Sequence, residues 1–265
     1  MSHSAPLLDF FRRGEVPRDI RLLAAQGVLA PRAHEQIGIL VLLSADRDAE
    51  IRDTVARTLN GIPTGALCSY LARSDVPIGV REFFGDRGIF PAEIPAITAD
   101  DPLIDVSIDA SGDADISAGQ VEADVEGQPV DTLLQKLQKM NIVERLKMAM
   151  SGSREVRAIL IRDPNKMIGA AVLSSPKVTE SEVESFARMA TVSEDILRTI
   201  GTNRAWLKNY AIVFALTKNP KSPIGLSLHL MNRLNDRDLA GVSTDRNVPD
   251  PLRTAARRKV VLGGR

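Results

Sequence analysis

Short apolar segments separated by capping and turn residues recur along this chain, and they limit what it can fold into. The motifs "DPNK" at 163 and "NPKS" at 219 place Asp or Asn before proline. We expect the Asp or Asn oxygen to cap a helix and the proline to take its first position. The motif "TESE" at 179 has the capping-box pattern, with Thr179 three residues before Glu182. These signals predict many brief helices.

The sequence indicates where several of these helices lie. Residues 33–43 and 49–59 predict two short helices separated by "SADRD". From Asp131 to Met150 apolar residues recur every three or four positions, which gives one apolar stripe and predicts a further helix. The stripe consists of Leu133, Leu134, Leu137, Met140, Val143 and Leu146.

The capping and turn residues repeat in the same order within the C-terminal half. Residues 163–200 align with residues 219–256 without a gap at an offset of 56, and four pairs in this window are identical. The alignment rests on residue class and turn signals, such as Pro164 with Pro220 and Gly169 with Gly225. A competing offset of 44 superposes "SSPK" on "KNPK". Both offsets are typical of two-helix units stacked in a row.

The net charge of zero hides an uneven distribution. Residues 1–91 carry eleven basic and eleven acidic side chains, residues 92–131 carry eleven acidic and no basic ones, and residues 132–265 carry 23 basic and 12 acidic ones. The acidic stretch also lacks aromatic residues, so it cannot bury enough apolar surface to offset chain entropy. We expect a disordered linker at 92–130. The alternation of Ile104, Val106 and Ile108 leaves open a short strand on a partner or on the protein itself.

Both halves contain a helix start in which an acid, then Ile or Val, then Arg follow one another: Glu50-Ile51-Arg52 and "EVR" at 155. This pattern resembles HEAT repeats and the related leucine-rich variant repeats. The segments "LLDFFRRGEVPRDIRLLAAQGVL", "NRAWLKNYAIVFALTKNPKSP" and "NVPDPLRTAARR" are similar to a bacterial family of helical-repeat proteins. The resemblance implies a fold and no particular activity. It implies an all-α, HEAT-like α-solenoid in two modules, 5–91 and 131–262, joined by the acidic linker.

Few residues have the pattern that catalysis or metal binding requires. Cys68 is the only cysteine and cannot form an internal disulfide, and the three histidines lack a recognisable partner motif. We expect His229 at an interface between repeats. Glycine-rich phosphate loops, GxSxG and HExxH are absent from the sequence. We therefore expect no enzyme, no catalytic residue, no cofactor and no metal site.

The first thirty residues lack the basic-then-apolar layout of a signal peptide, and no run of about 18 apolar residues occurs. These two observations predict a cytoplasmic protein.

One segment gathers the large amphipathic rings. Trp206 and Tyr210 stand four residues apart and would share a face on a continuous helix. The rings either fasten one repeat to the next, with their polar groups at the edge, or project into a groove as anchors for a partner. The candidate partner-binding residues are Arg204, Trp206, Lys208, Asn209, Tyr210, Arg253 and Arg257.

A stack of helical repeats offers a long, rigid concave surface. We therefore expect a non-catalytic scaffold or adaptor that holds a protein or peptide segment, acidic segments included, in the groove of the C-terminal module. The alternative is nucleic-acid binding, because a surplus of eleven positive charges in residues 132–265 favours phosphate through counterion release. The acidic linker is either a solvated spacer or a segment that occupies the basic surface until a partner displaces it.

Overall fold

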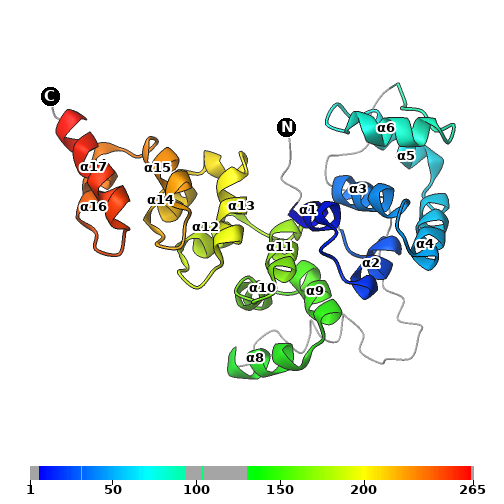
Figure 1. The fold of residues 1–265 in the computed structure, drawn as a ribbon, viewed down its shortest axis with the longest axis horizontal. Helices are drawn as coiled ribbons and strands as arrows, with labels where there is room; N and C mark the ends of the chain where they lie inside the picture. The colour runs from blue at the N-terminus through cyan, green and yellow to red at the C-terminus, as the bar shows by residue number, and fades with distance from the viewer. Residues whose placement is uncertain (1–5, 31, 94–102, 104–129, 264–265) are drawn as a thin grey trace. The chain divides into compact units, whose positions relative to one another are not determined.

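The computed structural model describes residues 6–30, 32–93, 103 and 130–263, and every regular element in these ranges is a helix (Figure 1). The all-α prediction is confirmed for this part of the chain. The predicted linker at 92–130 lies almost wholly outside the described residues, as do Ile104, Val106 and Ile108. Within the described ranges, no helix combines the length and the apolar character needed to cross a membrane.

The chain divides into two compact units. Unit 1 comprises residues up to Val156 together with Ser174–Lys177, and unit 2 comprises Arg157–Leu173 together with the residues from Val178 onward. The modules expected at 5–91 and 131–262 are defined by the linker between them, and they stay a prediction.

Unit 1 is built around one apolar helix, α3. Its helices are α1 (Pro6–Arg13), α2 (Arg18–Ala25), α3 (Ala33–Leu43), α4 (Ala49–Asn60), α5 (Thr64–Leu71), α6 (Ile78–Gly85), α8 (Val130–Lys139) and α9 (Ile142–Ser151). Helix α3 packs against α1, α2, α4 and α6, and Ile37, Ile39 and Leu40 are all buried. A helix that is apolar on every side belongs at the centre of a fold. The helices expected at 33–43 and 49–59 are confirmed as α3 and α4.

The apolar stripe from Asp131 to Met150 does not form one helix. It is interrupted at Asn141, whose side chain accepts from the backbone of Glu144 while Glu144 binds the backbone of Asn141, so the two residues form a capping box for α9. The apolar spacing continues across this break because helices on both sides bury Leu137 and Leu146. Periodicity alone therefore did not detect the cap.

Glu35 is a buried carboxyl group in the first turn of α3, with 3% of its surface exposed. Its Oε1 accepts from the Ser174 hydroxyl at 3.1 Å, whereas Oε2 is buried without a hydrogen-bond partner. Burial raises the pKa of Glu35 to about 7, against the smaller opposing effects of Arg32, Ser174 and the Leu7 backbone amide. Below about pH 7, the native state of unit 1 therefore keeps the Glu35 carboxyl protonated.

This raised pKa predicts that unit 1 loses stability as pH rises. Between the unfolded-state pKa near 4.5 and the folded-state pKa of about 7, the native state holds a proton that the unfolded state has released. Glu35→Gln should abolish this loss and stabilise unit 1 at pH 8 by up to about 3 kcal/mol. The measurement is the protection of α3 amides against hydrogen exchange at pH 5 and pH 8. The exposed Glu82→Gln is the control, and parallel pH profiles for wild type and Glu35→Gln would contradict the account.

Unit 2 consists of paired short helices. After α10 (Arg154–Leu160), which begins in unit 1, it contains α11 (Lys166–Ser174), α12 (Glu180–Arg188), α13 (Glu194–Thr202), the 3₁₀ helix η1 (Trp206–Lys208), α14 (Tyr210–Lys218), α15 (Ile224–Met231), α16 (Asp236–Thr244) and α17 (Asp250–Gly263). Helix α12 packs on α13 and α14, α14 on α15, α15 on α17, and α16 on α17 (Figure 1). His229 is exposed on α15, so the expectation that it lies at an interface is wrong.

A buried ion pair joins α10 to α12. Nε and Nη2 of Arg157 donate to Glu182 Oε1 at 3.0 and 2.8 Å, and these residues are 5% and 2% exposed. Glu182 Oε2 accepts from the Thr179 backbone at 3.0 Å, completing the predicted capping box of α12. The Glu182 carboxylate therefore caps α12 and also binds α10.

Two buried glycines allow α11, α13 and α15 to approach closely. A Cβ atom on Gly169 would lie 3.1 Å from Ile196 Cγ1, and a Cβ atom on Gly201 would lie 2.9 Å from Leu226 Cδ1 and 3.1 Å from its Cγ. These distances are shorter than ordinary carbon–carbon contacts. The neighbouring helices therefore pack against the glycine backbone itself.

Gly201→Ala should consequently lower the stability of unit 2, by roughly 1–3 kcal/mol, because the Leu226 side chain must leave its rotamer or α13 and α15 must move apart. Gly241→Ala is the matched control, since a Cβ there meets nothing within 4 Å in helix α16. Alanine at that site should be neutral or stabilising by up to about 1 kcal/mol. Thermal unfolding followed by Trp206 fluorescence measures both changes. Equal melting temperatures for the two variants would rule out the close contact.

Candidate functional site

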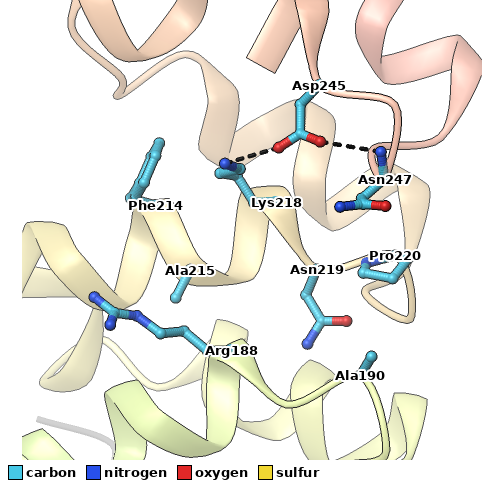
Figure 2. A pocket seen from close by; sticks show the side chains of 9 residues that line it. All are labelled: Arg188, Ala190, Phe214, Ala215, Lys218, Asn219, Pro220, Asp245 and Asn247. Carbon is cyan, nitrogen blue, oxygen red and sulfur yellow. Dashed lines mark hydrogen bonds and ion pairs between the residues drawn. The ribbon is translucent and has the colours of Figure 1, made fainter. Parts of the chain in front are cut away.

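A cavity of about 620 Å³ lies where α12 and α14 end and where the chain turns from α16 to α17 (Figure 2). All of its lining residues belong to unit 2. They are Arg188, Ala190, Phe214, Ala215, Lys218, Asn219, Pro220, Asp245 and Asn247.

Asn219 holds two walls of the cavity together. Its side-chain amide donates to the carbonyl oxygens of Ala187 at 2.7 Å and Met189 at 3.1 Å, and its Oδ1 accepts from the Lys221 backbone amide at 2.9 Å. The residue is only 3% exposed, so these bonds replace those that water would supply. Asn219 therefore acts as a positioning residue that ties the turn after α12 to the turn after α14.

The third wall is fastened by an ion pair. Lys218 Nζ lies 2.8 Å from Asp245 Oδ2, and 5.4 Å from the centre of the Phe214 ring. The backbone amide of Asn247 donates to Asp245 Oδ1 at 3.0 Å, and Figure 2 shows both contacts of this carboxylate. The Lys218 hydrogen bond, followed by the Asn247 amide, lowers the pKa of Asp245. Asp245 therefore carries its charge in support of the wall.

The rim offers polar groups that a partner can reach. The Arg188 side chain is 64% exposed and pairs with Glu184 one turn earlier on α12. Asn247 and Pro220 are also exposed, while Ala215 is buried in the floor and Phe214 is half-buried. Arg188 and Lys218 stand at helix C-termini, where positive charge complements the helix dipole. An apolar floor beneath guanidinium and amide donors is suited to hold an extended peptide that presents carbonyl or carboxylate oxygens.

The sequence motif at 219 has a different role from the one expected. Asn219 does not cap the following helix, because α15 begins only at Ile224. It ends α14, and its side chain caps the amide two residues later within the turn. Asp163 behaves in the same way, accepting from the Asn165 backbone at 2.8 Å before α11 begins at Lys166. The prolines after both residues occupy these turns.

The expectation that Trp206 and Tyr210 share the face of one helix is wrong. Trp206 and Lys208 lie in η1, and Asn209 then adopts extended backbone geometry and caps α14 by accepting from the Ala211 amide. The local side-chain cap ends the first helix and starts the next within four residues, which the spacing of the rings could not indicate. Trp206 is half-buried, whereas Arg204 and Lys208 are exposed.

Asn209 and Tyr210 serve contacts between helix N-termini. The Asn209 amide donates to Glu180 at 3.0 Å, and the Tyr210 hydroxyl donates to Asp238 at 2.5 Å and accepts from the Asn235 backbone at 3.2 Å. Partial burial, followed by the Asp238 bond, raises the pKa of Tyr210. These contacts join the starts of α12, α14 and α16.

None of the seven sequence-predicted residues lines the cavity. Tyr210 and Lys218 lie at opposite ends of α14, about 12 Å apart along its axis. Arg253 pairs with Asp250 on α17, and Arg257 Nε donates to the Ser243 carbonyl at 3.1 Å.

Two cavity residues, Asn219 and Asp245, share a turn pattern with Asp163 that the sequence analysis did not use. Asp163, Asn219 and Asp245 each follow the end of a helix and each cap the amide two residues later. The spacing of 56 between the first two is visible in the sequence. Nothing local distinguishes Arg188 or Asn247 from other surface residues, because their importance comes from what lies beside them.

Across the described ranges, no cluster of three or more His, Cys, Asp or Glu side chains is placed to bind a metal ion. In comparisons with known proteins, no family model, no curated protein and no solved structure matches the chain.

Proposed function

We propose that the chain is a non-catalytic protein–protein interaction scaffold, and that unit 2 binds an extended segment of a partner protein across the cavity at Arg188 and Asn247. The helix pairs are HEAT-like repeats of an α-solenoid, in a cytoplasmic protein whose two modules, 5–91 and 131–262, are joined by the acidic linker 92–130.

The positions of the helices support the assignment of repeats. Helices α10 and α14 begin 56 residues apart, and so do α12 and α16, which corresponds to the offset found in the sequence. Helix α12 begins 26 residues after α10, and α14 begins 30 residues after α12, so the offset of 56 spans two helix pairs. The same side-chain-to-backbone turn recurs at Asp163, Asn219 and Asp245. Equivalent positions in three of the four helix pairs thus make equivalent contacts.

The single observation that carries the binding proposal is the composition of the cavity. Its walls come from the ends of α12, α14 and α16 and are fixed by buried Asn219 and by the Lys218–Asp245 pair. Its exposed groups, Arg188 and Asn247, lie at the rim. A preformed site of this kind binds without the entropic cost of ordering its own walls. Arg188 gives the site a preference for a carboxylate in the bound segment.

Nucleic-acid binding is the second candidate, and the exposed arginines of α17 support it. Arg257 and Arg258 are both exposed on this helix, within the part of the chain that has the positive surplus. Binding to arbitrary duplex DNA that weakens steeply as salt rises would favour this candidate over the scaffold.

The scaffold proposal predicts that cavity variants lose binding while the fold is kept. Peptides selected from a random display library against the whole chain should bind with an affinity that Arg188→Ala and Asn247→Ala each weaken by roughly tenfold. Fluorescence anisotropy of a labelled peptide measures this change. Both residues are exposed, so melting temperatures should stay close to wild type.

Arg198→Ala supplies the matched control. Arg198 pairs with Glu194 at the same spacing as Arg188 with Glu184, and is similarly exposed at 57% against 64%, but does not line the cavity. It should leave peptide binding unchanged, as should Trp206→Ala. Loss of binding in Trp206→Ala with full binding in Arg188→Ala would show that the peptide binds near the N-terminus of α14 instead of at the cavity. Failure to select any peptide would reject the proposal.

A further inference from the structure

Leu103, in unit 1, packs against the buried apolar cluster formed by α3, α5, α6 and the turns between them. Its side chain is half-buried against this cluster, which includes Ile37, Leu71 and Phe84. It belongs to the acidic stretch, yet it lies far along the chain from the helix it contacts. Its backbone N–H donates to the side-chain oxygen of Gln36, on α3, at 3.2 Å.

Gln36 is arranged to receive that backbone group. The residue is only 1% exposed, and its amide nitrogen donates to the Gly27 carbonyl oxygen at 2.9 Å. This bond fixes the orientation of the side-chain amide, because the nitrogen must face Gly27. Its oxygen then accepts from Leu103. A buried, oriented amide of this kind recognises a backbone N–H of any sequence, while the apolar cluster beside it selects a large aliphatic side chain.

The sequence around Leu103 fits docking through the Leu103 backbone N–H. Pro102 precedes it and has no N–H, so the Leu103 amide is the first donor after the proline. In the sequence, the acidic residues Asp100 and Asp101 precede this Pro-Leu pair and Asp105 follows it. Leu103 therefore combines a backbone donor with an apolar side chain that packs on the cluster.

Two arginine side chains beside the cluster bond to backbone carbonyl oxygens. Arg81 Nε donates to the Leu71 carbonyl at 3.1 Å, and Arg87 donates to the Phe83 carbonyl at 2.8 Å while stacking 3.6 Å from the Phe83 ring centre. Phe83 packs on the same apolar cluster as Leu103. Because Glu82 lies on α6 and Asp86 at its C-cap, the local charge is balanced, and the docking rests on the apolar cluster and on Gln36.

We propose that Gln36 and the adjacent apolar cluster form a docking site for a peptide segment that presents a leucine, and that Leu103 of the same chain is its resident occupant. Docking fastens the acidic stretch to unit 1 at Leu103. The site is separate from the cavity of unit 2. Because Leu103 is tethered, it competes with any free peptide at an effective concentration of about millimolar.

The experiment uses a fluorescein-labelled peptide of residues 98–108, "TADDPLIDVSI", titrated into the whole chain. Leu103→Ala empties the site, so this variant should bind the peptide about tenfold more tightly than the wild-type chain does. The same peptide with alanine in place of its leucine should not bind to either chain. In nuclear magnetic resonance spectra, the Gln36 side-chain amide signal of Leu103→Ala should shift on addition of the unlabelled peptide.

Three results would contradict the docking proposal. Equal affinity for the wild-type chain and Leu103→Ala, or no binding to Leu103→Ala, would overturn the proposal. So would a loss of stability in Leu103→Ala as large as that in Leu71→Ala, because Leu71 is fully buried and a comparable loss would make Leu103 a core residue instead of a docked one. Exchange of the α3 amides measures both losses.

Discussion

The hydrogen bonds of Asn219 to the carbonyl oxygens of Ala187 and Met189 are the interaction on which the candidate site depends. They join two turns that are about thirty residues apart in sequence and that form two walls of the cavity. Helices of nine residues such as α12 and α14 are marginal in isolation, and their stability comes from packing on neighbours. A buried amide that bonds to both turns fixes the register of this packing, since a shift would leave its polar atoms unpaired.

The same logic recurs elsewhere in unit 2 with different chemistry. The Arg157–Glu182 pair sets α10 against α12, and removal of either partner would leave a buried charge uncompensated. Gly201 sets the distance from α13 to α15 by steric contact with Leu226. Polar bonds thus specify alignment, and close apolar contacts specify spacing. Together they place Arg188 and Asn247 at the rim, although neither residue takes part in these contacts.

Much of the local structure could be predicted from the sequence, because it depends on signals a few residues apart. Helices α3 and α4 lie where the sequence predicts them, and the Thr179 capping box follows from its motif. The helix expected from Trp206 to Tyr210 failed because Asn209 caps α14, and a cap outweighs the pattern of apolar residues around it. The cavity could not be predicted, since the partners of Asn219 lie in another helix pair and Arg188 gains its role only from that neighbour.

Hydrogen–deuterium exchange of Asn219→Ala tests this dependence most directly. If the Asn219 bonds hold the walls together, amides in the turn at 189–192 and in the turn at 221–223 should exchange faster than in the wild-type chain, while those of α16 and α17 keep their protection. Unchanged exchange in the turn after α12, or an equal rise throughout unit 2, would contradict the account.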